Sequence, residues 1–264
     1  MRPSIGLALG AGSARGLAHL GVLKAFEESE IDINYLGGTS MGSIIGGFYA
    51  VGLDFDMLER LAVNLKWDHL TDITVPRRGL IAGNKVRDFF ELLTHKKTFD
   101  QLDIPFVTVA TDIERGEEVI IKEGLVADAL RASMSIPGIY VPYELEGRLL
   151  VDGALLTRVP VSSVRELGAD IVIGVEVSQN VIRGGGVNNI FDVIMNSVDI
   201  MQQEIAEHKN TGADLLIIPE VAHIPSRGLD HAQECIDLGY QAVQKLLPKV
   251  ENLIKEWTDD EEVD

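Results

Sequence analysis

The sequence is poor in several features that would assign it to a common class. Cys235 is the only cysteine among 264 residues, which excludes an intramolecular disulfide and a zinc site built on cysteines, and fits a reducing compartment. Prolines number only nine, and 46% of the residues are hydrophobic. This composition excludes a disordered, fibrous or low-complexity chain and indicates an ordinary globular protein.

Basic residues are scarce as well. The 23 lysines and arginines stand against 41 aspartates and glutamates, which leaves a formal net charge of -18. Such an acidic surface makes nucleic acid an unfavourable ligand and gives no long-range attraction to anionic lipid. Any contact with a membrane would therefore have to be local and apolar.

Long apolar runs without interruption are also absent. An uncharged stretch covers residues 34–53, but its six glycines and several hydroxyls argue against a transmembrane helix. Residues 5–14 faintly imitate a secretory signal, yet their glycines and alternating pattern fit a buried strand and turn better. We therefore expect a cytoplasmic protein.

Hydrophobic periodicity predicts strands that alternate with helices. Short apolar runs predict strands at residues 5–9, 33–36, 106–113, 118–122, 149–151, 171–177 and 215–218. Helical spacing predicts helices over residues 15–30, 43–51, 55–67, 86–93, 191–205 and 232–257,. The alternation indicates α/β architecture, and the lack of a linker predicts one domain over residues 1–264. Residues 68–84 have no clear period, so we interpret them as a connection in preference to a lid.

A candidate nucleophile lies between the second predicted strand and the next helix. Gly38-Thr39-Ser40-Met41-Gly42 matches the G-x-S-x-G pattern of a nucleophile elbow, a sharp turn that holds the serine hydroxyl out of the sheet. The flanking Gly38 and Gly42 would keep the crowded turn free of side-chain clashes. The same residues also fit a glycine-rich helix start with Ser40 as an ordinary N-cap, so the motif alone leaves both interpretations open.

A glycine-rich turn follows the first predicted strand and opens a helix, which favours an anion at its backbone N–H groups. A dinucleotide pyrophosphate is one candidate, but G-x-G-x-x-G needs a glycine where this chain has Arg15, and Gly16 comes one place late,. A transient oxyanion is the other, because two adjacent N–H donors suffice for it. The candidate donors are the amides of Gly10, Ala11, Gly12 and Ser13.

Histidine is a poor candidate for the base that such a serine needs. Ser40 comes too early in the chain for an α/β-hydrolase with the usual triad. His19 is on the first predicted helix, and His208, His223 and His231 come later. We expect all four at the surface.

Asp152 is the stronger candidate for the base. It directly follows the apolar strand at residues 149–151 and precedes Gly153, so its carboxylate is expected at a strand end, where α/β sheets place chemistry. A hairpin turn at Asp152-Gly153 is the alternative interpretation.

The combination of these segments closely resembles the bacterial patatin-like phospholipases. The resemblance rests on the turn with Arg15-Gly16, on Gly38 to Gly42 and on Asp152-Gly153-Ala154, in order and at suitable spacing. It covers about residues 5–163, including residues 132–137, a segment of the kind that precedes the aspartate in that family.

The resemblance implies a fold and an activity. The fold is a three-layer α/β sandwich with a mostly parallel central sheet flanked by helices. The activity is hydrolysis of lipid acyl esters by a Ser-Asp dyad without histidine, in which Ser40 is the nucleophile, Asp152 the base, and Gly10 to Ser13 the oxyanion turn. The family turn often has four glycines, and Ala11 and Ser13 take two of those places here. A positive φ at either residue would be strained.

Other features leave several questions open. No metal-ligand cluster and no acidic loop at EF-hand spacing is present, so we expect neither metal nor cofactor. The apolar residues near Phe48-Tyr49 and at 58–65 are expected to be core in preference to an acyl channel. A nucleotide-binding regulator and a non-catalytic lipid-binding module are the alternative functions. An apolar lip around Leu80-Ile81 for peripheral membrane contact, or action on monomeric lysolipids, are both compatible with the sequence.

Overall fold

The computed structural model describes residues 2–66, 71–75, 77–179, 187, 190–208 and 212–261. Its strands are β1 (Ile5–Leu9), β2 (Tyr35–Thr39), β3 (Gly79–Ile81), β4 (Phe106–Asp112), β5 (Glu117–Ile121), β6 (Gly138–Tyr140), β7 (Tyr143–Leu145), β8 (Arg148–Asp152), β9 (Ile171–Val175) and β10 (Leu215–Ile217). Its α-helices are α1 (Ala18–Glu28), α2 (Met41–Ala50), α3 (Phe55–Asn64), α5 (Asn84–Leu93), α6 (Val126–Ser133), α7 (Val161–Glu166), α8 (Ile190–His208) and α9 (Ala232–Glu261). Short 3₁₀ helices are η1 (Ser13–Leu17), η2 (Phe99–Gln101), η3 (Gly153–Leu155) and η4 (Leu229–His231).

The central sheet is mostly parallel, as predicted. The described strands form an eight-stranded sheet in the order β10-β9-β1-β2-β4-β8-β7, with β5 also paired to β4. Neighbours from β10 to β4 are parallel. β5, β8 and β7 add antiparallel pairs at the other end.

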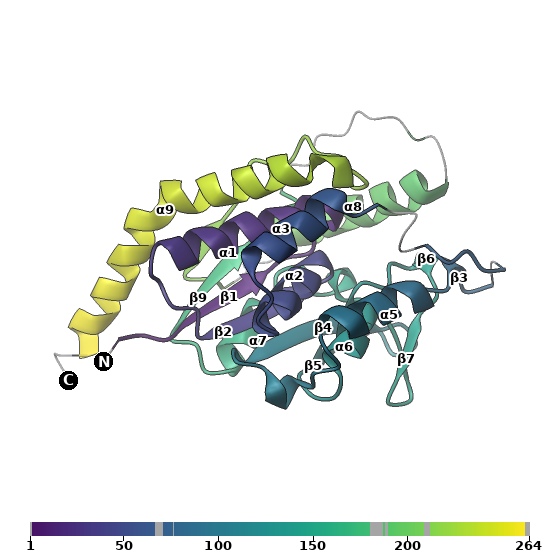
Figure 1. Ribbon diagram of the computed structural model, residues 1–264, viewed down its shortest axis with the longest axis horizontal. Helices are drawn as coiled ribbons and strands as arrows, with labels where there is room; N and C mark the ends of the chain where they lie inside the picture. The colour runs from purple at the N-terminus through teal and green to yellow at the C-terminus, as the bar shows by residue number, and fades with distance from the viewer. Residues whose placement is uncertain are drawn as a thin grey trace.

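Helices cover both faces of this sheet (Figure 1). Side chains alternate between the faces along β1, since Leu7 and Leu9 belong to the larger core while Ala8 belongs to a smaller one,. The larger core includes buried side chains of α1, α2, α6 and α9. The smaller core includes Val161 and Val164 of α7. The three-layer α/β sandwich is thereby confirmed.

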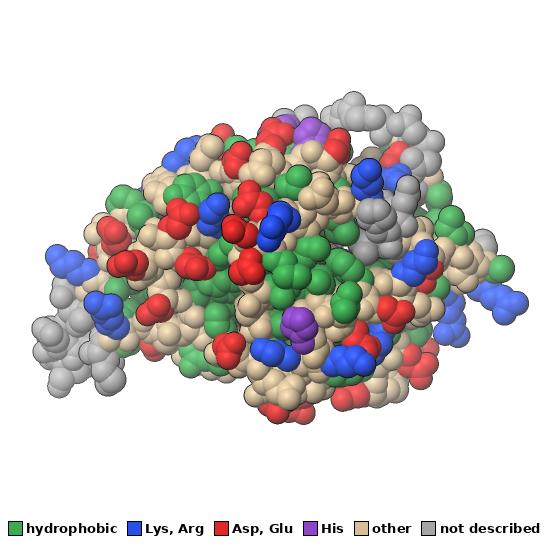
Figure 2. Space-filling view, in the orientation of Figure 1, with side chains coloured by type: hydrophobic (Ala, Val, Ile, Leu, Met, Phe, Trp, Pro, Cys, Tyr) green, Lys and Arg blue, Asp and Glu red, His purple; other side chains and the backbone are tan. Residues whose placement is uncertain are grey.

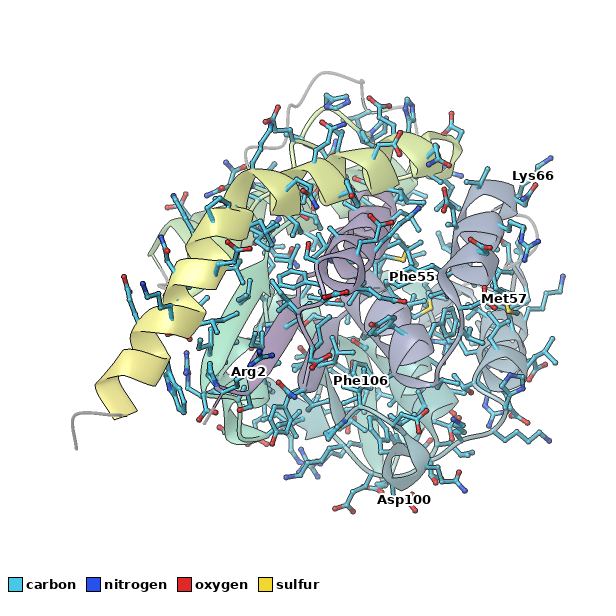
Figure 3. The ribbon with its side chains drawn as sticks, turned by 60° about the vertical axis from the view of Figure 1, so that its left-hand side comes forward. Arg2, Phe55, Met57, Lys66, Asp100 and Phe106 are labelled. Atoms are coloured by element: carbon cyan, nitrogen blue, oxygen red, sulfur yellow. The ribbon has the colours of Figure 1, made fainter. Side chains whose placement is uncertain are left out.

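The packing of α2 on the sheet depends on its glycines. Phe106, labelled in Figure 3, begins β4, and its ring lies 3.2 Å from the position that a Cβ of Gly46 would occupy. The small residues of this helix therefore let it approach β4 closely.

The register of β4 brings two other strands end to end. β5 occupies one edge of β4 along residues 108–112. β2 and β8 must therefore share the other edge, where Thr39 pairs with Val109 and Asp152 pairs with Ala110. The carboxyl ends of β2 and β8 thus meet at adjacent rungs of the same ladder.

Several predicted boundaries differ from the structure. The second strand extends to Thr39, inside the G-x-S-x-G motif. Only glycine fits at two of its positions, because a Cβ would lie 2.4 Å from Val164 at Gly37 and 2.4 Å from Ser43 at Gly38. The first helix begins as η1 and becomes α-helical only at Ala18. Residues 68–70 and 76 lie outside the described residues, and β3 pairs with β6 in a separate two-stranded sheet. The choice between lid and connection stays a prediction, as does the single domain.

Candidate active site

Ser40 is held in a strained turn between β2 and α2. Its φ of 55° and ψ of -121° lie in a region that a residue with a side chain rarely adopts. Its N–H donates to Ser133 Oγ at 2.9 Å, and its carbonyl accepts from Ser43 Oγ at 2.7 Å. These contacts fix the strained backbone, so the hydroxyl keeps one orientation.

Glycines let the backbone come close around this turn. A Cβ on Gly42 would lie 2.2 Å from the carbonyl oxygen of Leu9, at the end of the neighbouring strand. The other motif glycines are equally confined, since a Cβ would meet a neighbouring atom at 2.2–2.5 Å on Gly16, Gly38 and Gly153. A larger residue at Gly16 or Gly42 would therefore push the first turn away from the Ser40 turn.

Asp152 lies directly beside Ser40. Ser40 Oγ donates to Asp152 Oδ2 at 2.6 Å, and the Ala154 N–H donates to Oδ1 at 2.9 Å. The two residues are 7% and 6% exposed. Burial raises the pKa of Asp152 to about 6, against the opposing effect of these two hydrogen bonds,. The carboxylate is therefore a stronger base than an exposed aspartate.

Asp152 lies at a strand end, as expected, but its strand is not one of the parallel strands of the sheet. β8 runs antiparallel to β4, so its end would ordinarily lie at the opposite edge from Ser40. Asp152 reaches Ser40 because β8 stops partway along β4, where β2 also ends.

Residues 132–137 support both members of the pair. Ser133 Oγ accepts from the Ser40 N–H and donates to the carbonyl oxygen of Val109 at 2.7 Å. The Asp152 N–H donates to the Ser135 carbonyl oxygen at 3.0 Å. The sequence pointed to this segment only through resemblance, and the structure gives it a physical role in positioning.

The four amides of the first turn have different partners. The Gly10 N–H donates to Val175 O, and the Ala11 N–H donates to Arg158 O, both at 2.9 Å. No acceptor among the described residues takes the N–H of Gly12 or of Ser13, and both residues line the pocket that contains Ser40. Ser13 has a φ of 50°, so the predicted strain at a non-glycine position falls there and not on Ala11.

His19 is wrongly predicted as a surface residue. It is fully buried, and its Nε2 lies 2.7 Å from the Gly10 carbonyl oxygen. Burial lowers the pKa of His19 to about 4, so the ring is neutral near pH 7 and its Nε2–H donates to Gly10. Sequence periodicity misses this role because His19 is in the first turn of α1, next to the glycine turn.

Neither His223 nor His231 forms a hydrogen bond with Ser40 or Asp152; their contacts lie elsewhere. His223 and His231 are exposed, as predicted, and both contact Glu234. The side chain of His208 lies outside the described residues.

Further residues around the turn include Arg15, which carries part of the resemblance, and Ser178 and Asp199, which were not singled out from the sequence. Arg15 is buried and donates to Asp199 Oδ2 at 3.1 Å. Ser178 Oγ donates to the Ala11 carbonyl oxygen at 2.9 Å. Asp199 belongs to α8, so the turn, the end of β9 and α8 meet here. They surround a pocket with about 390 Å³ of empty space, counting the part open to solvent, whose lining includes Gly12, Ser13, Ser40, Asp152, Ser178 and Asp199.

A second hollow lies next to the Ser40 turn, since Met41 is one of its lining residues. It contains about 680 Å³ of empty space, counting the part open to solvent, and is almost entirely apolar. Figure 2 shows hydrophobic side chains gathered between α3 and α5, where it opens. Phe48 and Leu58 are buried, as predicted, but they also wall this hollow. Its lining includes Leu17, Met41, Phe48, Leu61, Phe89 and Met134.

Metal ligands and membrane-spanning helices were sought among the described residues. No three His, Cys, Asp or Glu side chains gather there as metal ligands. No helix in those same ranges is long and apolar enough to cross a membrane.

Comparison with solved structures shows the fold. VipD from Legionella pneumophila superimposes with a TM-score of 0.61 over 94% of this chain and 67% of its own, at 14% identity. The type III effector ExoU matches with a TM-score of 0.51 over 94% of this chain and 53% of its own, also at 14% identity.

Comparison of sequences then gives the family. The sequence model of the patatin-like phospholipases matches residues 7–165. An uncharacterised NTE family protein of Mycobacterium tuberculosis is 36% identical over 179 residues, 67% of this chain and 49% of the relative. Lysophospholipase NTE1 of Pyricularia oryzae is 34% identical over 180 residues, 66% of this chain and 12% of the relative. The chain spans about half the length of the mycobacterial relatives that it matches. It belongs to the patatin-like phospholipase family.

Proposed function

We propose that this chain hydrolyses acyl esters of lipids, with Ser40 as the nucleophile and Asp152 as the base. The hydrogen bond of 2.6 Å from Ser40 Oγ to a buried carboxylate carries the proposal. A relative is named a lysophospholipase, which supports an acyl lipid as substrate.

The reaction follows from this hydrogen bond. Asp152 Oδ2 takes the proton of Ser40 Oγ while the oxygen attacks the ester carbonyl carbon. Collapse of the tetrahedral intermediate breaks the ester bond, and the protonated Asp152 returns its proton to the leaving alcohol. Water then attacks the acyl-serine with Asp152 again as base, which releases the fatty acid and restores Ser40.

The oxyanion would bind to two of the four predicted amides. Gly10 and Ala11 already donate to backbone carbonyls, so they hold the turn in place. The N–H groups of Gly12 and Ser13 are adjacent, have no acceptor among the described residues, and belong to residues that line the same pocket as Ser40. Two adjacent backbone donors suffice to stabilise a developing oxyanion.

The apolar hollow would hold the acyl chain. Met41 lines it and directly follows Ser40, and Met134 lines it between Ser133 and Ser135. A chain esterified to Ser40 can therefore leave the polar pocket and enter an apolar space without crossing the sheet. Burial of methylenes there would contribute to binding roughly in proportion to chain length.

Nucleotide binding at the first turn has less support. Asp152 and Asp199 both line the pocket, and their carboxylates would repel a pyrophosphate. The helix that follows the turn is the five-residue 3₁₀ helix η1, and Arg15 is already paired with Asp199.

Covalent labelling by a fluorophosphonate tests the proposal. Wild type should form an adduct on Ser40 and release fatty acid from lysophosphatidylcholine. Ser40→Ala should do neither, and Asp152→Asn should label much more slowly. Ser162→Ala, at an exposed serine of α7, serves as the matched control and should behave as wild type. Lipid binding by a wild type that neither labels nor hydrolyses would instead identify a non-catalytic lipid-binding module.

A further inference from the structure

Exposed apolar side chains concentrate at one end of the molecule. Among the described residues, thirteen large apolar side chains are exposed. Two of them precede β3, one precedes α8, and four belong to α8. These seven are Ile73, Val75, Val187, Ile190, Val193, Ile200 and Met201. We call them the apolar rim.

The first part of the rim is a hairpin that projects from the fold. Ile73 forms an antiparallel bridge with Ile81, and the Thr74 N–H donates to the Leu80 carbonyl oxygen at 3.0 Å. Ile73 is 86% exposed and Val75 is 73% exposed. Leu80 and Ile81, where the sequence predicts an apolar lip, belong to the other strand of this hairpin and are half-buried. The exposed apolar side chains are therefore those of Ile73 and Val75.

Arginines lie at the tip of the same hairpin. Arg77 and Arg78 follow Val75 and are both exposed. In a chain with a net charge of -18, two adjacent cations beside two exposed aliphatic side chains are a local exception. Figure 2 shows Lys and Arg side chains beside hydrophobic ones at the right-hand end, where Figure 1 labels β3.

The second part of the rim is the outer face of α8. Ile190, Val193, Ile200 and Met201 fall within about a third of the helix circumference at 100° per residue. Met195, Asp199 and Gln202 lie on the other side and line the pocket of Ser40. One helix therefore walls the catalytic pocket inside and presents an apolar stripe outside.

The two parts adjoin each other near the pocket. Gly79 of β3 pairs with Gly138 of β6, and a Cβ on Gly138 would lie 3.1 Å from Ile194 of α8. The preceding residues, Ile136 and Pro137, line the pocket of Ser40. Gly79, which follows Arg78, and α8 therefore both lie next to the segment that lines this pocket.

We propose that the apolar rim and Arg77-Arg78 dock this chain on an anionic membrane surface. The arginines would contact lipid phosphates while the aliphatic side chains enter the boundary between headgroups and acyl chains. α8 contains four acidic residues, Asp192, Asp199, Glu204 and Glu207, and no lysine or arginine, so the attraction comes from the hairpin tip. The charge complementarity and the continuity with a pocket for acyl lipids favour a membrane over another protein. The proposal concerns binding, which can hold even if Ser40 is not catalytic.

Vesicle flotation of Ser40→Ala, which keeps vesicles intact, tests this docking. The protein should float with phosphatidylcholine vesicles that contain phosphatidylserine, and much less with phosphatidylcholine alone or at high salt. Arg77→Ala combined with Arg78→Ala should weaken binding about 25-fold, since each cation near an anionic surface contributes a factor of about five. Ile73→Asp combined with Val75→Asp should abolish flotation.

Matched variants keep the test decisive. Ile120→Asp alters an equally apolar, exposed position on β5, away from the rim, and should float as its parent does. All variants should melt near the parent temperature, and the rim changes made in active enzyme should leave hydrolysis of a soluble short-chain ester unchanged. Equal flotation of rim variants and parent would overturn the proposal. So would a dimer in sedimentation that Ile73→Asp dissociates, because the rim would then bind a second copy.

Discussion

The polar pocket and the apolar hollow both lie next to the Ser40 turn and differ in how they are built. The pocket consists of a few polar groups whose positions are fixed by specific hydrogen bonds, such as those of Ser40 and Asp152. The hollow is lined by many aliphatic and aromatic side chains without a preferred direction of contact. Changes in the pocket should therefore act abruptly, whereas changes in the hollow should act gradually and depend on substrate length.

The comparison also indicates where selectivity resides. Hydrogen-bonded groups at the pocket would discriminate the reacting ester from other groups, because unpaired buried polar groups are costly. Apolar walls discriminate weakly between chains that differ by one methylene. We therefore expect strict chemistry together with a broad range of acyl chains.

Removal of the proposed base, Asp152, should have the largest effect. Asp152→Asn keeps a side chain of similar size beside Ser40 but cannot take its proton, so kcat should fall about 10³-fold while KM changes little. Steady-state hydrolysis of a soluble short-chain ester measures this. Near wild-type turnover in Asp152→Asn would show that another group acts as base.

The pH dependence of turnover should be the next largest effect. Burial raises the pKa of Asp152 to about 6, and only its ionised form accepts the serine proton. kcat should therefore rise with pH and level off above about 7, with about one tenth of the plateau at pH 5. His19 cannot cause this rise, since its pKa is lowered to about 4. A profile without an inflection between pH 5 and 7 would contradict the assignment of Asp152.

Much of this pocket could be predicted from the sequence, because its signals are local. The G-x-S-x-G motif between a strand and a helix places Ser40, and an aspartate directly after an apolar strand suggests a functional carboxylate. The parallel sheet follows from strands that alternate with helices. The helices α6 and α7, with eight and six residues, are too short to give a clear period.

The contacts between distant segments could not be predicted. The contact of Ser40 with Asp152 depends on β2 and β8 ending at adjacent rungs of β4, and register between distant strands is set by the packing of the whole sheet. His19 is misassigned for a similar reason. Its helix has apolar residues over most of its surface, so the pattern does not show which neighbour the ring meets.

His19 provides the third prediction, which concerns positioning in the pocket. Its Nε2–H donates to the Gly10 carbonyl oxygen, so His19→Ala should loosen the glycine turn and lower kcat about tenfold with little change in KM. His19→Gln retains an N–H donor and should recover most of the rate. Kinetics of both variants separate this effect from a loss of stability, which would reduce the active fraction without rescue by glutamine.

Filling the hollow should have the smallest effect, and it should depend on the substrate. Leu61 of α3 lines the hollow, whereas Val63 on the same helix is exposed and does not. Leu61→Trp should lower kcat/KM for long acyl chains by about fourfold, the equivalent of one methylene that is no longer buried, and leave short-chain esters unaffected. Val63→Trp should leave both unchanged. If Leu61→Trp slows short and long esters equally, the hollow is structural core and the acyl chain leaves Ser40 by another path. The dependence of the rate on acyl-chain length would then be expected to change with substitutions in the apolar rim and α8 instead.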